Sequence, residues 1–207
     1  MSGSLEHEAT SRRIIQERLL LGQEVTIIPC GSPRCDAEGT CLSVHSDEKC
    51  GNWFSRCNEL VLVNSHGIVS EEMARHISCA LTLKMLVTPL VPFVEMHLER
   101  AYYEAMKRGE KETEVRMADH KRLQLKVGQV VQMTSGLEGL LARVKHLRTY
   151  RTLTDLYAAE DPNEIVPGGD AAHFREILEA LYAGKFDLPA MAINLEVLGS
   201  LRTEDRN

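Results

Sequence analysis

Apolar residues recur at helical spacing through most of the chain after residue 70. From Glu112 to Tyr157 they return every three, four or seven positions, which is the period of one helix face. A shorter segment of the same kind, Phe93 to Arg108, precedes it, and Gly109 separates the two. This spacing predicts two long helices joined at Gly109 and packed as an antiparallel hairpin with a coiled-coil-like seam.

The rest of the pattern predicts shorter elements. Helical spacing is present in residues 4–22, 70–87, 170–183 and 187–201, with Ser70 as the N-cap of the second. Residues 24–29 and 59–64 are rich in β-branched residues and predict two short strands. The expected fold is therefore mainly α, with a small zinc-stabilised β knot near the N-terminus, a long antiparallel helical hairpin and a C-terminal helical pair. The expected domains are an N-terminal helix with a cysteine-rich module (1–69), the hairpin (70–160) and an acidic helical segment (161–207).

Charge is distributed unevenly. The net charge is −6, but residues 152–207 hold 11 acidic and 4 basic side chains, so the remainder is close to neutral. The acidity belongs to the C-terminal segment and does not exclude a nucleic-acid partner. The first 22 residues have no apolar core of a secretion signal, and the most apolar stretch, Ile77 to Val94, contains Lys84, Pro89 and Pro92. A cytoplasmic protein without a membrane partner is expected.

Five of the six cysteines lie within 28 residues, and this stretch carries the clearest candidate chemistry. Zinc takes four tetrahedral Cys or His ligands, and His45 lies in the same stretch. The tight Cys-x2-Cys pair of most zinc knuckles is missing, so which four ligands bind stays open. A structural Zn²⁺ is the favoured interpretation; a redox or iron–sulfur role and ordinary thiols are the alternatives, and Cys79 is expected in the core. The candidate ligands are Cys30, Cys35, Cys41, Cys50 and Cys57.

The segment from Cys50 to Val63, Cys-Gly-Asn-Trp-Phe-Ser-Arg-Cys-Asn-Glu-Leu-Val-Leu-Val, adds a resemblance. Together with the predicted helices after it, this segment resembles the cysteine-rich, helical C-terminal tail of large bacterial and phage-type tyrosine recombinases, over about residues 25–150. The resemblance implies a zinc-binding knot and charged helices. No recombinase catalytic domain is present: His97-Leu98-Glu99-Arg100 fits a His-x-x-Arg box, but no tyrosine lies between Tyr103 and Tyr150.

A basic run near the end of the long periodic segment is the candidate nucleic-acid site. It consists of Arg143, Lys145, Arg148 and Arg151, with His146 among them and no acidic residue between. Such a run can contact phosphates, or it can form a solvated face that balances the acidic segment.

These observations predict a protein without enzymatic activity, a zinc-binding module in DNA transactions. Its expected partners are DNA or a recombinase-type protein, with a second copy of the chain docking through the helical hairpin. A protein-interaction adaptor without nucleic-acid contact and a thiol-based redox sensor are the two alternatives.

Overall fold

The computed structural model describes residues 13–14, 16–17, 20, 57–62, 67–168, 171–183 and 189–201. The chain divides into two compact units, Met1–Pro92 and Phe93–Asn207, which are described separately. The described residues before 57 are helical, in agreement with the predicted N-terminal helix at those positions. The predicted strand 24–29 and the candidate ligands Cys30, Cys35, Cys41 and Cys50 lie outside the described residues.

The described part of the first unit is a β-α-β element. Strand β1 (Glu59–Leu62) pairs in parallel with β2 (Leu86–Pro89), and helix α3 (Glu71–Thr82) connects them. The predicted strand is confirmed by β1. The predicted N-cap is also confirmed, because the Ser70 hydroxyl accepts a hydrogen bond from the Met73 amide at 3.1 Å. The predicted helix end near residue 87 is wrong. Lys84 takes a left-handed conformation (φ 57°) that ends the helix, and the chain then enters β2.

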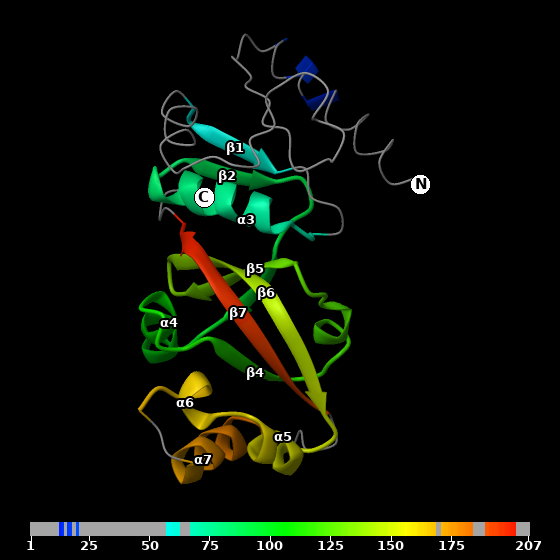
Figure 1. Ribbon diagram of the computed structural model, residues 1–207, viewed down its shortest axis with the longest axis vertical. Coiled ribbons are helices and arrows are strands. Elements are labelled where there is room, and N and C mark those ends of the chain that lie inside the picture. The colour runs from blue at the N-terminus through cyan, green and yellow to red at the C-terminus, as the bar shows by residue number, and fades with distance from the viewer. Residues whose placement is uncertain are drawn as a thin grey trace. The chain divides into compact units, whose positions relative to one another are not determined.

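The second unit is built on a five-stranded sheet with the strand order β3-β5-β6-β7-β4 (Figure 1). All neighbours pair antiparallel except β3 and β5. Helix α4 follows β3, and helices α5, α6 and α7 lie together between β6 and β7 in sequence. The elements are β3 (Val94–His97), α4 (Arg100–Lys107), β4 (Thr113–Met117), the 3-10 helix η2 (Arg122–Gln124), β5 (Val130–Ser135), β6 (Glu138–Tyr150), α5 (Leu153–Ala159), α6 (Pro162–Ile165), α7 (Ala171–Leu181) and β7 (Ala190–Ser200).

This sheet corrects the predicted fold class, which is α/β and not mainly α. The predicted long helix 112–157 is instead β4, β5, β6 and the start of α5, so neither the helical hairpin nor its coiled-coil seam exists. The physical reason lies in β6. Its pairing with β7 shifts register between Val144 and His146, and this bulge inserts a residue into the two-residue alternation. Val144 and Leu147 therefore contact the same core at a spacing that imitates a helix.

Two other predicted helices contain strands for a related reason. Residues 93–108 divide into β3 and α4, and β7 occupies the positions predicted as the last helix. Most residues of β7 are buried, on both faces of the sheet. A strand covered on both sides has no polar alternation, so its apolar run cannot be told from a buried helix by periodicity. The helix predicted at 170–183 is confirmed as α7.

The two faces of the sheet pack into separate cores. One face packs against α4 and Leu125, and its largest fully buried side chains include Tyr103, Met106 and Met133. The other face packs against α5, α6 and α7, with Phe174 and Leu156 at its centre. The helices α5 to α7 gather at one end of this unit (Figure 1).

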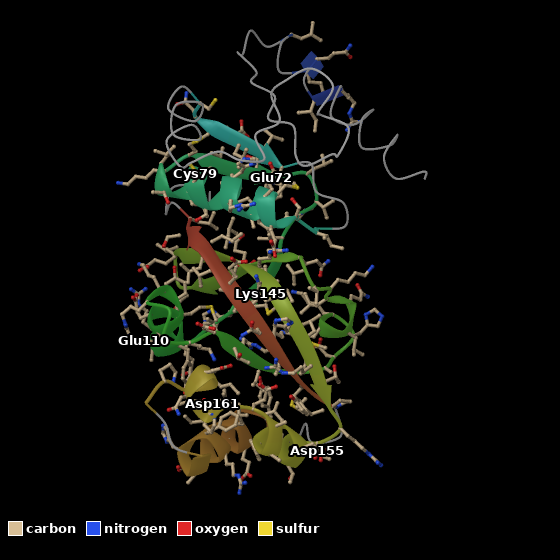
Figure 2. The ribbon with its side chains drawn as sticks, viewed as in Figure 1. Glu72, Cys79, Glu110, Lys145, Asp155 and Asp161 are labelled. Atoms are coloured by element: carbon tan, nitrogen blue, oxygen red, sulfur yellow. The ribbon has the colours of Figure 1, made fainter. Side chains whose placement is uncertain are left out.

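Local signals fix where the helices of this insertion begin. The Thr152 hydroxyl and the Asp155 carboxylate form a reciprocal capping box at the start of α5, and Asp161 caps α6 ahead of Pro162. Both aspartates are labelled in Figure 2. Among the helices of the described residues, none is long and apolar enough to cross a membrane.

Candidate anion-binding site at the sheet edges

The site lies where the outermost strands of the sheet, β3 and β4, are covered by charged side chains. The amide of Leu98 bonds to the Thr134 carbonyl of β5, so the carbonyls of Glu95 and His97 point away from the sheet. Lys121 Nζ donates to the Glu95 carbonyl at 3.2 Å, and Arg116 Nη2 donates to the His97 carbonyl. Because Arg116 belongs to β4, this bond also joins the two edge strands of the curled sheet. We call this junction the seam.

The free edge of β4 is covered in the same way. The Glu112 carbonyl bonds to β7, so the carbonyls of Thr113 and Val115 point outward. Lys111 Nζ donates to the Thr113 carbonyl at 2.7 Å, and the Tyr182 hydroxyl donates to the Val115 carbonyl at 2.7 Å. Unpaired strand edges invite pairing with another chain, and side-chain donors on the outward carbonyls block it.

Three charged residues connect these edges. Lys111 Nζ lies 3.2 Å from one carboxylate oxygen of Glu114, and Arg116 Nε lies 2.8 Å from the other. The Lys111 and Glu114 side chains are 2% and 9% exposed, whereas Arg116 is 22% exposed. Lys111 Nζ also donates to the Ile165 carbonyl at 2.6 Å and so attaches α6 to β4. Two cations against one carboxylate leave the cluster with excess positive charge.

The pKa shifts around the cluster follow from its burial. Burial lowers the pKa of Lys111; the Glu114 carboxylate raises it in part, and Arg116 lowers it further. Burial raises the pKa of Tyr182 to about 12, assisted by Glu114 and opposed by Arg116 and Arg122. The Tyr182 phenol therefore stays protonated near neutral pH and keeps the hydrogen that it donates to the Val115 carbonyl, and Arg122 lies near enough to act on the same phenol.

The geometry decides which of these groups can meet a ligand. An ammonium group has three N–H donors, and those of Lys111 are used by two carbonyls and one carboxylate. Lys111 is therefore held as a structural cation and is not poised as a nucleophile. Arg116 is the more accessible cation of the cluster, and its planar guanidinium has five donors that suit a phosphate or carboxylate. The seam can bind an anion through Arg116.

The loop after β4 adds further cations beside the seam. Lys121 and Lys126 are exposed, and Arg122 is partly exposed. Arg122 bonds to the Asp119 carboxylate, so its position is fixed by a neighbour in the same loop. This group of cations, Lys121, Arg122 and Lys126, is called the basic loop below.

The sequence-predicted basic residues lie on or just after β6 and are not gathered at the seam. Arg143 and Lys145 lie 3.5 and 3.6 Å from Glu196 of β7, and Lys145 is labelled in Figure 2. Arg148 binds Glu160 at the end of α5, while Arg151 is exposed. Their role in nucleic-acid binding stays a prediction.

The candidate metal ligands cannot be compared with the structure as a set. Cys57 lies just before β1 and is partly exposed, and Cys79 lies on α3 (Figure 2); the other four cysteines fall outside the described residues. Within the described part of the chain, no three His, Cys, Asp or Glu side chains are grouped as metal ligands. The zinc assignment stays a prediction.

Sequence reasoning missed Lys111, Glu114 and Arg116. A signal was present, since Glu114 and Arg116 alternate with Val115 and Met117 in the two-residue period of a strand. The segment is only five residues long and was absorbed into the predicted long helix. His97 and Arg100, which fit the His-x-x-Arg spacing, lie at the end of β3 and the start of α4, where Arg100 binds Glu138 at 2.5 Å.

Comparisons with known proteins give partial structural similarity. No family model and no curated protein matches the chain. The crystal structure of the hypothetical protein PH0355 is 27% identical, covers 51% of this chain and 99% of its own, and has a TM-score of 0.47. The solution structure of PF0455 from Pyrococcus furiosus is 28% identical, with 52% and 98% coverage and a TM-score of 0.42. A mutant of ZmASCH from Zymomonas mobilis is 11% identical, with 54% and 74% coverage and a TM-score of 0.42.

The resemblance to a recombinase tail is wrong. None of the three solved structures is named as a recombinase or an integrase. The structure itself gives the physical reason, because β3, β4, β5 and β6 occupy the residues in which that resemblance implied charged helices.

Proposed function

We propose that this chain is a nucleic-acid-binding protein without enzymatic activity, whose Phe93–Asn207 unit contacts phosphate groups at the seam and the basic loop. The observation that carries the proposal is the excess positive charge of the Lys111–Glu114–Arg116 cluster, with its accessible cation, Arg116, fixed at a strand edge. A cation held in place by the protein loses little conformational entropy when it binds an anion.

The charge of the surrounding strands supports a polyanion over a single small anion. Residues 111–151 contain nine Lys or Arg and four Asp or Glu, a balance of +5, although the whole chain is at −6. Arg143 and Lys145 lie close to Glu196, and Arg148 binds Glu160, so these cations are balanced by acids from outside the stretch. The excess positive charge near the seam therefore comes from Arg116 and the basic loop, and several neighbouring cations suit the repeated charges of a nucleic-acid backbone. The acidic residues are concentrated in 152–207, mainly on the helical insertion and beyond it.

A charge-removal experiment tests the proposal. Lys121→Gln with Lys126→Gln removes two exposed cations of the basic loop. Lys107→Gln with Arg108→Gln removes two exposed cations at the end of α4 and is the matched control. At about 0.15 M salt, distant charges are largely screened. We expect the loop variant to bind a labelled oligonucleotide about tenfold more weakly, roughly 1.4 kcal/mol for two lost phosphate contacts. Equal weakening by both variants, measured by fluorescence anisotropy, would contradict the assigned surface.

We further propose that the Cys30 to Cys57 stretch binds one structural Zn²⁺. Five cysteines within 28 residues provide more than the four ligands that zinc requires, and a segment of that size needs such a constraint to fold. Metal analysis of the purified chain should give about one zinc per chain. A metal-free chain whose circular dichroism is unchanged by added zinc would refute this assignment. A reducing cytoplasm is the compartment that fits this use of cysteine.

A further inference from the structure

The loop between β4 and β5, residues 118–129, displays apolar side chains next to its cations. Leu123 is 60% exposed and Val127 is 54% exposed, whereas Leu125 between them is 7% exposed and packs into the core beneath the sheet. Leu125 therefore anchors the loop and turns its two neighbours outward. Single exposed aliphatic residues are ordinary, but here two of them lie within five residues and among three cations.

The loop is held in this conformation by its own hydrogen bonds. The amides of Arg122 and Leu123 bond to the side chain and carbonyl of Asp119, at 3.0 and 2.9 Å. The Lys126 amide bonds to the Gln129 side chain at 2.8 Å, and the Gly128 amide bonds to the Val144 carbonyl of β6 at 2.8 Å. These hydrogen bonds fix the conformation of the loop around η2. Leu123 is therefore exposed in an ordered conformation.

An exposed leucine flanked by the cations of the basic loop limits which class of ligand the loop can bind. A single-stranded nucleic acid would be bound chiefly by stacking on aromatic side chains. Residues 118–129 contain no Phe, Trp or Tyr, and their one ring, His120, lies 3.2 Å from the Gln124 amide. An anionic membrane surface would require a wide apolar face on an amphipathic helix, while η2 is three residues long. Leucine is one of the residues that proteins insert between base pairs of a duplex while cations hold the adjacent phosphates.

We propose that Leu123 is a wedge that enters between base pairs of a bound DNA duplex and kinks it. This inference rests on the proposed nucleic-acid binding and names its ligand as double-stranded DNA. Lys121, Arg122 and Lys126 hold the phosphates on either side of the step that opens, and Val127 covers the exposed sugar edge. The free-energy cost of partial unstacking is offset by the additional phosphate contacts that a bent duplex can make.

The test measures bending separately from binding. A duplex of about 25 base pairs carries a donor dye at one end and an acceptor at the other, and energy transfer is recorded with saturating full-length protein. The wild-type chain should increase the transfer, Leu123→Ala should lose most of that increase while it still binds, and Leu137→Ala should behave as wild type. Leu137 is the matched control because it is 74% exposed at the β5–β6 turn of the same unit.

The outcomes separate the wedge from the proposed function. Wild-type protein that binds the duplex and leaves it straight overturns the wedge alone, and so does Leu123→Ala protein that bends it fully. Tighter binding to the single strand, or to vesicles containing phosphatidylserine, than to the duplex also overturns the wedge. A chain that binds no nucleic acid at all overturns both proposals.

Discussion

Replacing Lys111 with methionine should destabilise the Phe93–Asn207 unit by about 3–5 kcal/mol, the cost of removing one partner of a buried ion pair. Methionine fills a similar volume but donates no hydrogen bond. The carbonyls of Thr113 and Ile165 would lose their donor, and the buried Glu114 carboxylate would keep only Arg116. Because the Ile165 bond attaches α6 to β4, the loss should also loosen that helix. Urea unfolding followed by circular dichroism measures the first effect, and amide exchange in α6 measures the second.

A double variant shows whether the buried charge is the cause. Lys111→Met combined with Glu114→Gln also removes the carboxylate that the single variant leaves underpaired. If the cost is electrostatic, the double variant should be less destabilised than the sum of the two single variants. Additive effects, or a loss below about 1 kcal/mol for Lys111→Met alone, would mean that Lys111 is not the structural cation that holds α6 to β4.

Replacing Glu160 with alanine should cost about 2–3 kcal/mol, because it removes charge-assisted hydrogen bonds at the end of α5. The Glu160 side chain is 3% exposed. It accepts two bonds from the Arg148 guanidinium at 2.6 and 2.5 Å, and one from the Tyr150 hydroxyl at 2.5 Å. These bonds attach α5 to the end of β6. Since Arg148 is 41% exposed and can regain water, the expected loss is smaller than at Lys111.

The same carboxylate gives the stability a pH dependence. Burial raises the pKa of Glu160, but the hydrogen bonds from Arg148 and Tyr150 outweigh burial, and the pKa ends below its ordinary value. The folded state therefore binds this proton less readily than the unfolded state. The contribution to stability is complete above the unfolded pKa, about 4.3, and is lost as the pH falls through the folded value. Glu160→Gln should reduce the loss of stability on acidification, whereas an unchanged acid profile would contradict this linkage.

Sequence patterns identified the elements whose signals are local. The strand leaving Cys57, the Ser70 cap and helix α7 depend on residues within a few positions of one another, and all three are present. The end of α3 was missed because Lys84 adopts a left-handed conformation that glycine or asparagine usually signals.

The sheet of the second unit could not be deduced from periodicity alone. The bulge in β6 gave Val144 and Leu147 the spacing of a helix, and burial of both faces removed the alternation from β7. The glycine at 136 was the strongest contrary signal. It has a positive φ of 60° and lies in the two-residue turn between β5 and β6, which glycine adopts without strain.

The candidate site depends on contacts that a linear pattern does not contain. Lys111 meets the carbonyl of Ile165, which is 54 residues away, and Arg116 meets the carbonyl of His97 on the opposite edge strand. A basic run in the sequence is conspicuous, as at Arg143 to Arg151, whereas a single lysine or arginine at a strand edge is not. The importance of such a single residue can be recognised only once the strand order is known.

The salt dependence of DNA binding by the full-length chain tests the central claim most directly. Contact with several phosphates releases counterions, so the logarithm of the association constant should fall linearly with the logarithm of salt concentration. With three to four phosphates held by Arg116 and the basic loop, we predict a slope of roughly −3 on duplex DNA at about 0.9 per phosphate. A slope near zero, or no binding at about 50 mM salt, would contradict phosphate contact at the seam.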